Sequence, residues 1–538
     1  MQTTKEVKKM AFNIFQNTII IVTLLMIALC CVNTGFFLKK LWNGFENKYD
    51  FLWLFLIITV LFLAGYGCMM ASDHYSVDSF NLVFDMSPYW HMQIGRYVNC
   101  GVILLALKAG VNQVIMQRFF IAVWLVTLVL MSVMITVSIA KQMGKMKKNT
   151  FFVLLLAVSL SFLNVFAMEL MLFPEMAMVF IPGNLALGLA VYTVLCEENS
   201  RKKWLLCVAY LIIALGSYQS YVGIFEAYVL IGIFFKWKDE TKKRYFNALT
   251  ALAIGGIISV FNVVLVKILI NLGLIADSGR GATFKISDIL LNTKNVIRYQ
   301  ASFWKDADGI LPPVIMPLLG IVLLCIIVSE LRKLDFEKKV FYILLIAGCY
   351  LLGFAPHLLE SSQVMSPRSN IAVWSVIAVV FITGINNMRE NYKLLDKVII
   401  AVSGLLIGIN CFVMQDMAAN EQAMNAIDIM EAKQISEQVL KYENETGNII
   451  TEVAARGDLN STYYQPDSRY KNWELGARIM STYYSNYRLI GFILNRSLER
   501  KDMPDEIYEK YFDGKDWNCL NVEEQMVLID DTLYLAVY

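Results

Sequence analysis

Acidic, aromatic and basic residues lie close together between residues 72 and 96, directly after an apolar run. Asp73 and Asp78 come first, Trp90 lies among other aromatic residues, and Arg96 ends the stretch. A positioned carboxylate can take up a proton during a reaction. Ionisable groups such as these are costly in lipid unless they line a wet cavity or lie outside the bilayer. The stretch therefore predicts a catalytic loop at the mouth of a membrane.

The composition is that of a membrane protein. Of the 538 residues 57% are apolar and only 17% are charged, and the mean hydropathy is +0.54. The net charge of +2 gives no clustered basic footprint of the kind that nucleic-acid binding requires. The ten cysteines have no C-x-x-C spacing, so we interpret them as small apolar residues.

Twelve apolar runs indicate helices that cross a bilayer, whose core of roughly 30 Å needs about 20 residues. They predict a polytopic α-helical membrane protein with about 11 to 12 transmembrane helices. The runs lie at residues 14–37, 51–71, 113–140, 150–172, 184–196, 204–218, 220–236, 246–274, 312–330, 340–357, 370–386 and 397–414.

The connections between the runs predict an orientation. Short lysine-rich connections lie at residues 141–148, 197–203, 236–244, 331–339 and 387–397. The positive-inside rule places them in the cytoplasm, so alternation places the loop 72–112 and everything from about residue 415 on the extracytoplasmic face. The run 14–37 is left open, because lysines flank it on both sides. Either it does not fully cross, or residues 5–9 lie outside.

Ionisable residues gather on the face that carries the loop 72–112. Glu169 lies inside an apolar run, where an ionisable residue is functional by default. Residues 97–110 are too short to span comfortably, so they predict a helix at the outer interface. Together these features describe a shallow polar site bordered by lipid. A substrate with a sugar head and a lipid tail would enter such a site from the side.

Several of these residues also form a pattern that resembles a known family. The pattern comprises Asp73 and Asp78, Gly95-Arg96, the segment 164–178 with its two glutamates, GSYQS at 216–220, and Pro367-Arg368. It resembles the GT-C superfamily of integral-membrane glycosyltransferases, and within it the bacterial GtrII-like O-antigen glucosyltransferases. The resemblance covers roughly residues 50–415 and departs from the family at Asp73-His74, where members often have two adjacent acids.

The resemblance implies a glycosyltransferase of the plasma (inner) membrane. It would move a sugar, glucosyl by the family's example, from a polyprenyl-monophosphate donor to an extracytoplasmic cell-envelope glycan. It implies Asp73 as the base, with Asp78 as its rival, and Arg96 and Arg368 as ligands of the donor phosphate. Residues that would bind the sugar or acceptor are Glu169, Glu175, Tyr218, Gln219 and Trp90.

Each role has a simpler alternative. Asp73 is also a favoured helix N-cap residue, and Glu169 is also suited to a structural pair with an arginine. Glu175 follows a proline and suits the first turn of a helix, and Arg368 is suited to lipid headgroups. No cofactor is implied with certainty. A divalent cation on Asp73 and two histidines, His74 and His91, is a further alternative, although the spacing of the histidines is not that of a metal site.

The chain is predicted to divide into an N-terminal membrane segment (1–50), a catalytic transmembrane domain (51–414) and a small extracytoplasmic α/β domain (415–538). In the last, helices are predicted at 417–446 and 472–497, a strand at 448–455, and a strand or hairpin at 526–537. Two other functions are compatible with the pattern, namely a polysaccharide polymerase or ligase and a transporter of lipid-linked sugars. No internal repeat supports the transporter.

Overall fold

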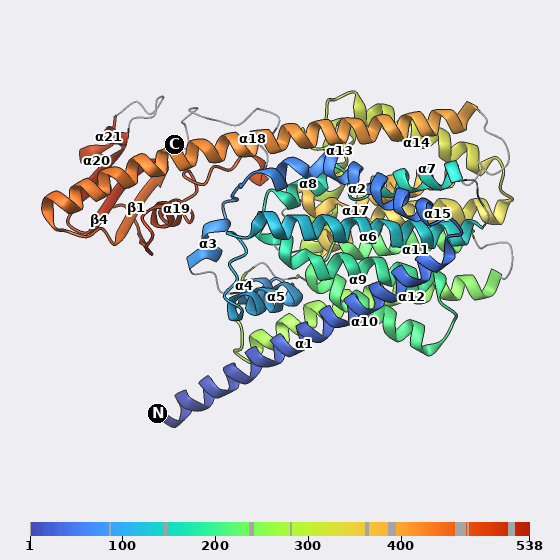
Figure 1. Ribbon diagram of the computed structural model, residues 1–538, viewed down its shortest axis with the longest axis horizontal. Helices are drawn as coiled ribbons and strands as arrows, with labels where there is room; N and C mark the ends of the chain where they lie inside the picture. The colour runs from blue at the N-terminus through green and yellow to red at the C-terminus, as the bar shows by residue number, and fades with distance from the viewer. Residues whose placement is uncertain are drawn as a thin grey trace.

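The computed structural model shows a long bundle of helices with a small mixed domain at one end (Figure 1). It describes residues 2–84, 88–144, 146, 148–235, 241–279, 282–283, 285–360, 365–385, 394–457, 470, 473–514 and 522–537.

The bundle confirms the prediction of a polytopic helical membrane protein. Among the described residues, seven helices are long and apolar enough to cross a membrane. They contain α1 (Gln2–Gly44), α2 (Lys48–Ala71), α6 (Gln117–Met143), α9 (Ala177–Cys196), α12 (Thr241–Asn271), α17 (Ala372–Ile385) and α18 (Leu394–Thr446), and the spans with α9 and α17 begin earlier, at Pro174 and Pro367. Other apolar runs form further helices outside this group, namely α7 (Lys148–Ser159), α10 (Arg201–Ser217), α11 (Tyr221–Phe235), α14 (Ile315–Leu331) and α15 (Phe336–Gly353).

Helix α2 illustrates how an apolar sequence builds such a bundle. Leu54, Ile58 and Phe62 recur every fourth residue and are buried against the other helices. Leu56 and Val60 on the opposite side stay half exposed. A helix that is apolar on every side is suited to a membrane, because its outer surface meets lipid instead of water. The helix ends at Ser72, where the chain becomes extended.

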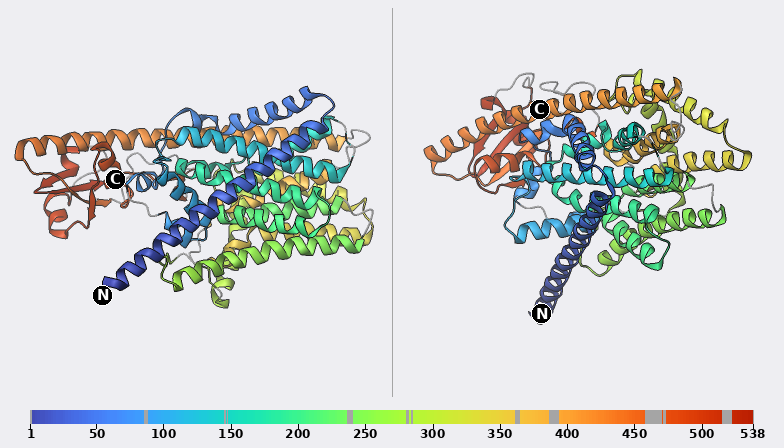
Figure 2. Two further views of the ribbon diagram at one scale, coloured as in Figure 1. Left: turned by 60° about the horizontal axis from the view of Figure 1, so that its bottom comes forward. Right: turned by 45° about the vertical axis from the view of Figure 1, so that its right-hand side comes forward.

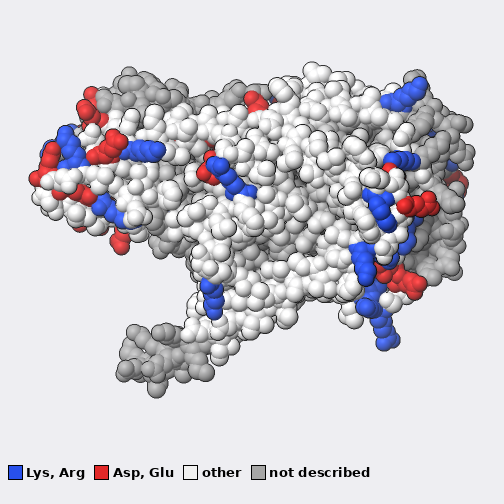
Figure 3. Space-filling view, viewed as in Figure 1, with Lys and Arg blue, Asp and Glu red and all other residues white. Residues whose placement is uncertain are grey.

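The two ends of the bundle differ in charge. Lys and Arg gather at the end opposite the mixed domain, and a broad uncharged zone separates the two ends (Figure 3). At the end opposite the mixed domain, ion pairs join Lys148 to Asp50 (2.5 Å) and Lys40 to Glu197 (3.4 Å). Helix α1 runs along the bundle from the side of the mixed domain to this charged end (Figures 1 and 2).

Short elements fill the other end, where the candidate site lies. They are α3 (Ser79–Phe84), α4 (Tyr89–Gln93), α5 (Tyr97–Lys108), α8 (Val165–Met171), the 3-10 helices η1 (Pro174–Met176) and η2 (Pro367–Asn370), and α16 (Ala355–Leu358). Helix α5 is mostly buried against α1, α9 and α10. Between the apolar runs predicted at 246–274 and 312–330 lies α13 (Ile286–Asp306), whose buried residues recur with helical spacing.

The C-terminal domain, by which we mean α18 from residue 415 and the described residues after it, has its own core. Its sheet has the order β2-β1-β4-β3, with only β3 and β4 antiparallel. The strands are β1 (Glu452–Gly457), β2 (Glu499–Lys501), β3 (Met526–Ile529) and β4 (Thr532–Val537). One face packs on α18 and α19 (Asn486–Ile493), and the other on α20 (Asp505–Tyr511); α21 (Val522–Gln525) precedes β3.

The hairpin predicted at 526–537 and the strand predicted near 448–455 are present. The helix predicted over 472–497 is wrong, because its described residues form only the 3-10 helix η4 (Trp473–Gly476) and α19, with turns between them. Helix α18 continues without a break through residue 415, so a single helix joins the bundle to the C-terminal domain.

Candidate functional site

A break in the fourth apolar run places a carboxylate at the end of the bundle. The run separates into α7 and α8, and Asn164 begins α8 by accepting hydrogen bonds from the main-chain N–H groups of Phe166 and Ala167 (3.0 Å each). This is the favoured use of asparagine at a helix start. The short helix then carries Glu169, whose side chain is fully buried.

Glu169 binds Arg368 twice. Its Oε2 accepts the main-chain N–H of Arg368 (2.5 Å), and its Oε1 accepts Nη1 of the same residue (3.1 Å). The guanidinium lies over the ring of Phe173 at 4.6 Å, and the Arg368 side chain as a whole is 22% exposed. A buried carboxylate and an aromatic face thus fix the plane of the guanidinium of a side chain that stays partly exposed. Such a group suits recognition of an anion with paired oxygens.

Tyr218 connects this pair to Arg96. Its hydroxyl donates to the carbonyl of Arg368 (2.8 Å), while the Arg96 guanidinium lies over its ring at 5.0 Å. Gln219 accepts from Arg96 Nε (3.4 Å) and donates to the carbonyl of Ile94 (2.7 Å). The two arginines selected from the sequence, 272 residues apart (368 minus 96), therefore meet the same tyrosine.

Gly95 permits this arrangement. Its φ of +80° lies in the left-handed region, and a Cβ atom there would meet Asn262 Oδ1 at 2.8 Å and Gln219 Nε2 at 3.0 Å. Only glycine adopts that conformation without strain and leaves room for both amides. The close packing holds the turn that aims Arg96 at Tyr218.

The loop that follows α2 carries Asp73 on its exposed side. The Asp73 carboxylate pairs with Arg118 Nε at 2.7 Å, and about half of each side chain is exposed. The next residue, His74, is buried, and its Nε2 lies 2.8 Å from the carbonyl of Met171 in α8. Burial lowers the pKa of His74, so the ring is neutral at pH 7 and its Nε2–H donates to that carbonyl.

Asp78 and Glu175 lie deeper in the same region. Glu175 is buried in η1 and accepts hydrogen bonds from the hydroxyls of Ser76 and Ser79, both at 2.7 Å. Asp78 is half-buried, and its carboxylate accepts from Asn81 (3.4 Å). Glu175 therefore holds the loop to the bundle, while Asp73 presents the more accessible carboxylate.

Two further predictions concern Trp90 and metal binding. Trp90 lies half-buried in the short helix α4. Among the residues that the structure describes, no group of three His, Cys, Asp or Glu side chains is placed to hold a metal ion. The Nε2–H of His74 is directed at a carbonyl, which leaves that nitrogen no lone pair for a cation.

The family model of glucosyl transferase GtrII matches residues 67–384, more than half of the chain. The chain belongs to the GtrII glucosyltransferase family. The resemblance seen in the sequence is thereby confirmed, and the protein is a membrane glycosyltransferase. Searches against curated proteins and against solved structures find no match. All nine site residues selected from the sequence lie inside the matched range.

Sequence reasoning missed several partners of these residues. Arg118, Phe173, Ser76 and Ser79 each contact a selected residue, yet none was identified. Arg118 left a signal, because it is a lone cation at the start of an apolar run on the same face as Asp73. Ser76 and Ser79 left no such signal, since serines are common in loops and do not by themselves indicate a partner.

The histidine of α4 predicts a pH dependence of stability. His91 is 3% exposed, and within the described structure neither ring nitrogen has a hydrogen-bond partner. Burial, assisted by the nearby Arg96, lowers the pKa of His91 to about 3. Below the usual histidine pKa of about 6.5, the imidazole of His91 becomes protonated in the unfolded chain but stays neutral in the folded chain. Stability is therefore lost as pH falls from there, by about 2 kcal/mol at pH 5.

We expect His91→Leu to reduce the fall in unfolding temperature between about pH 7 and pH 5, measured on purified protein in detergent. The matched control is Met92→Leu in the same helix, which changes a buried side chain without removing a titrating group. It should keep the wild-type pH dependence. Equal pH dependence in His91→Leu and wild type would contradict the prediction.

Proposed function

We propose that the protein transfers a glucosyl unit from a polyprenyl-monophosphate donor to a hydroxyl group of a cell-envelope glycan, on the extracytoplasmic face of the plasma membrane. The main support is that Arg96 and Arg368 both contact Tyr218, Arg96 with its guanidinium and Arg368 with its carbonyl. The accessible carboxylate of Asp73 lies at the same end of the bundle. Membership of a glucosyltransferase family supports the sugar. The lysine-rich opposite end supports the orientation.

In this proposal the carboxylate of Asp73 takes the proton of the acceptor hydroxyl as its oxygen attacks the anomeric carbon. The bond between that carbon and the phosphate oxygen breaks, and the lipid phosphate leaves with the bonding electrons. Arg368, oriented by Glu169, and Arg96, stacked on Tyr218, stabilise the negative charge of the leaving group.

The remaining site residues divide between support of the site and sugar binding. Glu169 and Glu175 already accept hydrogen bonds from protein groups, so we assign them to hold Arg368 and the loop. Gln219 and Tyr218 lie beside Arg96, where a sugar attached to the phosphate would be located. Trp90 offers an aromatic face for stacking. No metal is required in this scheme, and a divalent cation would act only as a further counter-charge to the phosphate.

The test is a comparison of donors with the purified protein and a cell-envelope glycan as acceptor. We expect transfer of radiolabel from polyprenyl-monophosphate glucose and none from a diphosphate-linked oligosaccharide. The reverse result would identify a polymerase or ligase. Binding of either lipid without transfer, but with movement across a vesicle membrane, would identify a transporter.

A further inference from the structure

The loop 72–78 is held from two sides. On one side, His74 and Ser76 bind the bundle through their side chains, as described above. On the other side, Tyr75 and Val77, which alternate with them, bind the C-terminal domain through their main chains. The loop thus lies between the bundle and the C-terminal domain, and the C-terminal domain is outside the range of the family match.

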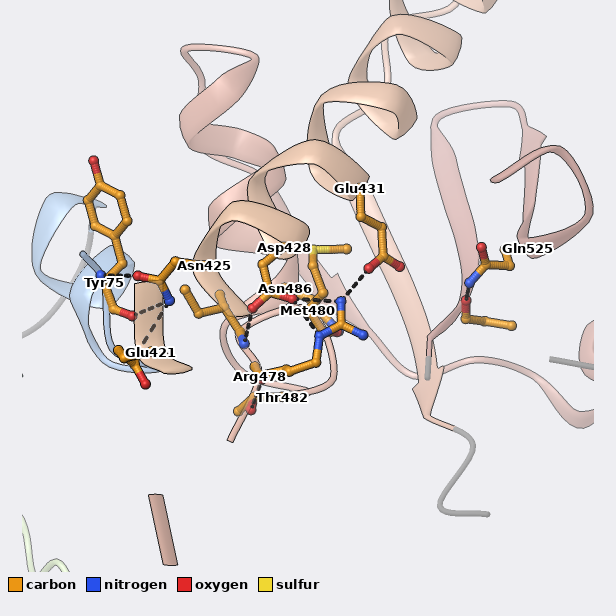
Figure 4. Close-up of polar contacts among 12 residues, drawn as sticks. Tyr75, Glu421, Asn425, Asp428, Glu431, Arg478, Met480, Thr482, Asn486 and Gln525 are labelled. Carbon is orange, nitrogen blue, oxygen red and sulfur yellow. Dashed lines mark hydrogen bonds and ion pairs between the residues drawn. The ribbon is translucent and has the colours of Figure 1, made fainter. Parts of the chain in front are cut away.

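The first contact with the C-terminal domain comes from α18 (Figure 4). Asn425 accepts the main-chain N–H of Tyr75 with its Oδ1 (2.5 Å) and donates to the carbonyl of the same residue with its Nδ2 (2.9 Å). It also donates to Glu421, one turn earlier on α18 (3.4 Å). A single buried amide thus satisfies both main-chain groups of one loop residue, two positions after Asp73.

The second contact is apolar. Phe80 of α3 is fully buried in the core of the C-terminal domain, with its ring 5.2 Å from Phe492 and 5.0 Å from Tyr75. The other members of that core come mainly from α18, α19 and the sheet, and include Ile435, Val439, Leu489, Ile490, Leu533 and Leu535. The loop therefore continues into a helix whose aromatic side chain is part of the other domain's core.

The third contact comes from α19 and the turn before it. Ser485 donates its hydroxyl to the carbonyl of Val77, and Arg488 donates to the side-chain oxygen of Asn81. Val77 immediately precedes Asp78. The C-terminal domain consequently touches the chain on both sides of Asp78.

A buried charge cluster fixes this contact surface (Figure 4). Arg478 pairs with Asp428 (2.7 Å) and Glu431 (2.6 Å) of α18, and all three side chains are at most 5% exposed. Asp428 also accepts the main-chain N–H of Ile479 (2.8 Å). These bonds tie the segment that leads to Ser485 onto α18, so Asn425 and Ser485 keep a fixed separation. Both oxygens of Asp428 and Oε2 of Glu431 accept hydrogen bonds in this cluster, and buried paired groups of this kind favour one arrangement.

We propose that the C-terminal domain is a positioning element of the active site. Asn425, Ser485 and Phe80 hold the loop so that the carboxylate of Asp73 reaches the acceptor hydroxyl. The effect on catalysis in this inference rests on the proposed function. The contacts that hold the loop do not depend on the proposed function. A displacement of about 1 Å at a reacting group can lower a rate about 100-fold. Each loop residue that loses its contact with the C-terminal domain regains main-chain conformational freedom.

The experiment uses the full-length protein in detergent with three variants. Asn425→Ala removes both bonds to Tyr75, and Ser485→Ala removes the bond to Val77. The control is Gln525→Ala, which removes another buried amide of the same domain, one that donates to the carbonyl of Ala536 and not to the loop (Figure 4). Hydrogen–deuterium exchange of the peptide covering residues 72–84 is measured together with kcat and the KM for the donor.

We expect faster exchange in that peptide and a fall in kcat of about 10- to 100-fold for Asn425→Ala, with the donor KM within about threefold. Ser485→Ala should show the same pattern to a smaller degree. Gln525→Ala should match wild type in both measurements.

Three results would overturn the inference: unchanged exchange in both loop variants, faster exchange with unchanged kcat, or equal losses in Gln525→Ala, which would indicate general damage to the domain. If the wild type transfers no sugar, the proposed function fails. The exchange measurement still decides whether the C-terminal domain holds the loop.

Discussion

Glu169→Gln is expected to lower glycosyl transfer by about 100-fold or more and to destabilise the protein by about 3–5 kcal/mol. The carboxylate is fully buried and accepts both the main-chain N–H and the guanidinium of Arg368. Glutamine would present an amide N–H to one of these donors and would leave the cation without its counter-charge. Transfer is measured at saturating donor, and stability by thermal unfolding.

The double variant Glu169→Gln/Arg368→Gln separates a structural pair from a phosphate site. Removing both charges abolishes the unpaired buried cation, so stability should return most of the way toward wild type. Transfer should stay low, because the group that stabilises the leaving phosphate is gone. Recovery of transfer together with stability would show that the pair is structural only.

A matched control lies at the other end of the bundle. Glu330 is also buried and pairs with Lys333 at 3.1 Å. We expect Glu330→Gln to change the unfolding temperature modestly, since its partner is more exposed, and to leave transfer unchanged. A comparable loss of transfer in this variant would mean that any buried charge change disturbs the site.

Much of the membrane architecture was predictable, because helix formation in lipid is dictated by long apolar runs. The gathering of the candidate residues at one end of the bundle was predictable as well, since charged residues are costly in the apolar zone. The pairing of Glu169 with Arg368 was beyond sequence reasoning. The two residues are 199 positions apart, and any of several arginines on that face satisfied the same pattern.

Two features of the C-terminal domain show where local patterns fail. The helical pattern over 472–497 is interrupted because Arg478 and the N–H of Ile479 are drawn into the buried acids of α18. The docking of Phe80 into the distant core likewise depends on contacts more than 340 positions apart, as with Asn425 and Tyr75 (425 minus 75). Tertiary contacts of this kind override the propensity of the local sequence.

Asp73→Asn is expected to reduce kcat by about 1,000-fold, within the range of 10²–10⁴ for loss of a positioned general base, and to leave the donor KM nearly unchanged. Asparagine keeps the shape of the side chain and an oxygen for Arg118, but it cannot take up the proton of the acceptor hydroxyl. Because the ion pair is about half exposed, its loss should cost less than about 1 kcal/mol of stability. A large fall in kcat with normal unfolding would therefore isolate the chemistry.

Two further variants make the assignment of the base decisive. Asp50→Asn alters another carboxylate that pairs with a cation, Lys148, at the opposite end of the bundle, and should leave transfer at the wild-type level. Asp78→Asn should retain transfer within about tenfold, because its half-buried carboxylate is occupied by Asn81 and is less accessible to an acceptor. An inactive Asp78→Asn beside an active Asp73→Asn would reverse the assignment. Activity in both would exclude this loop as the source of the base.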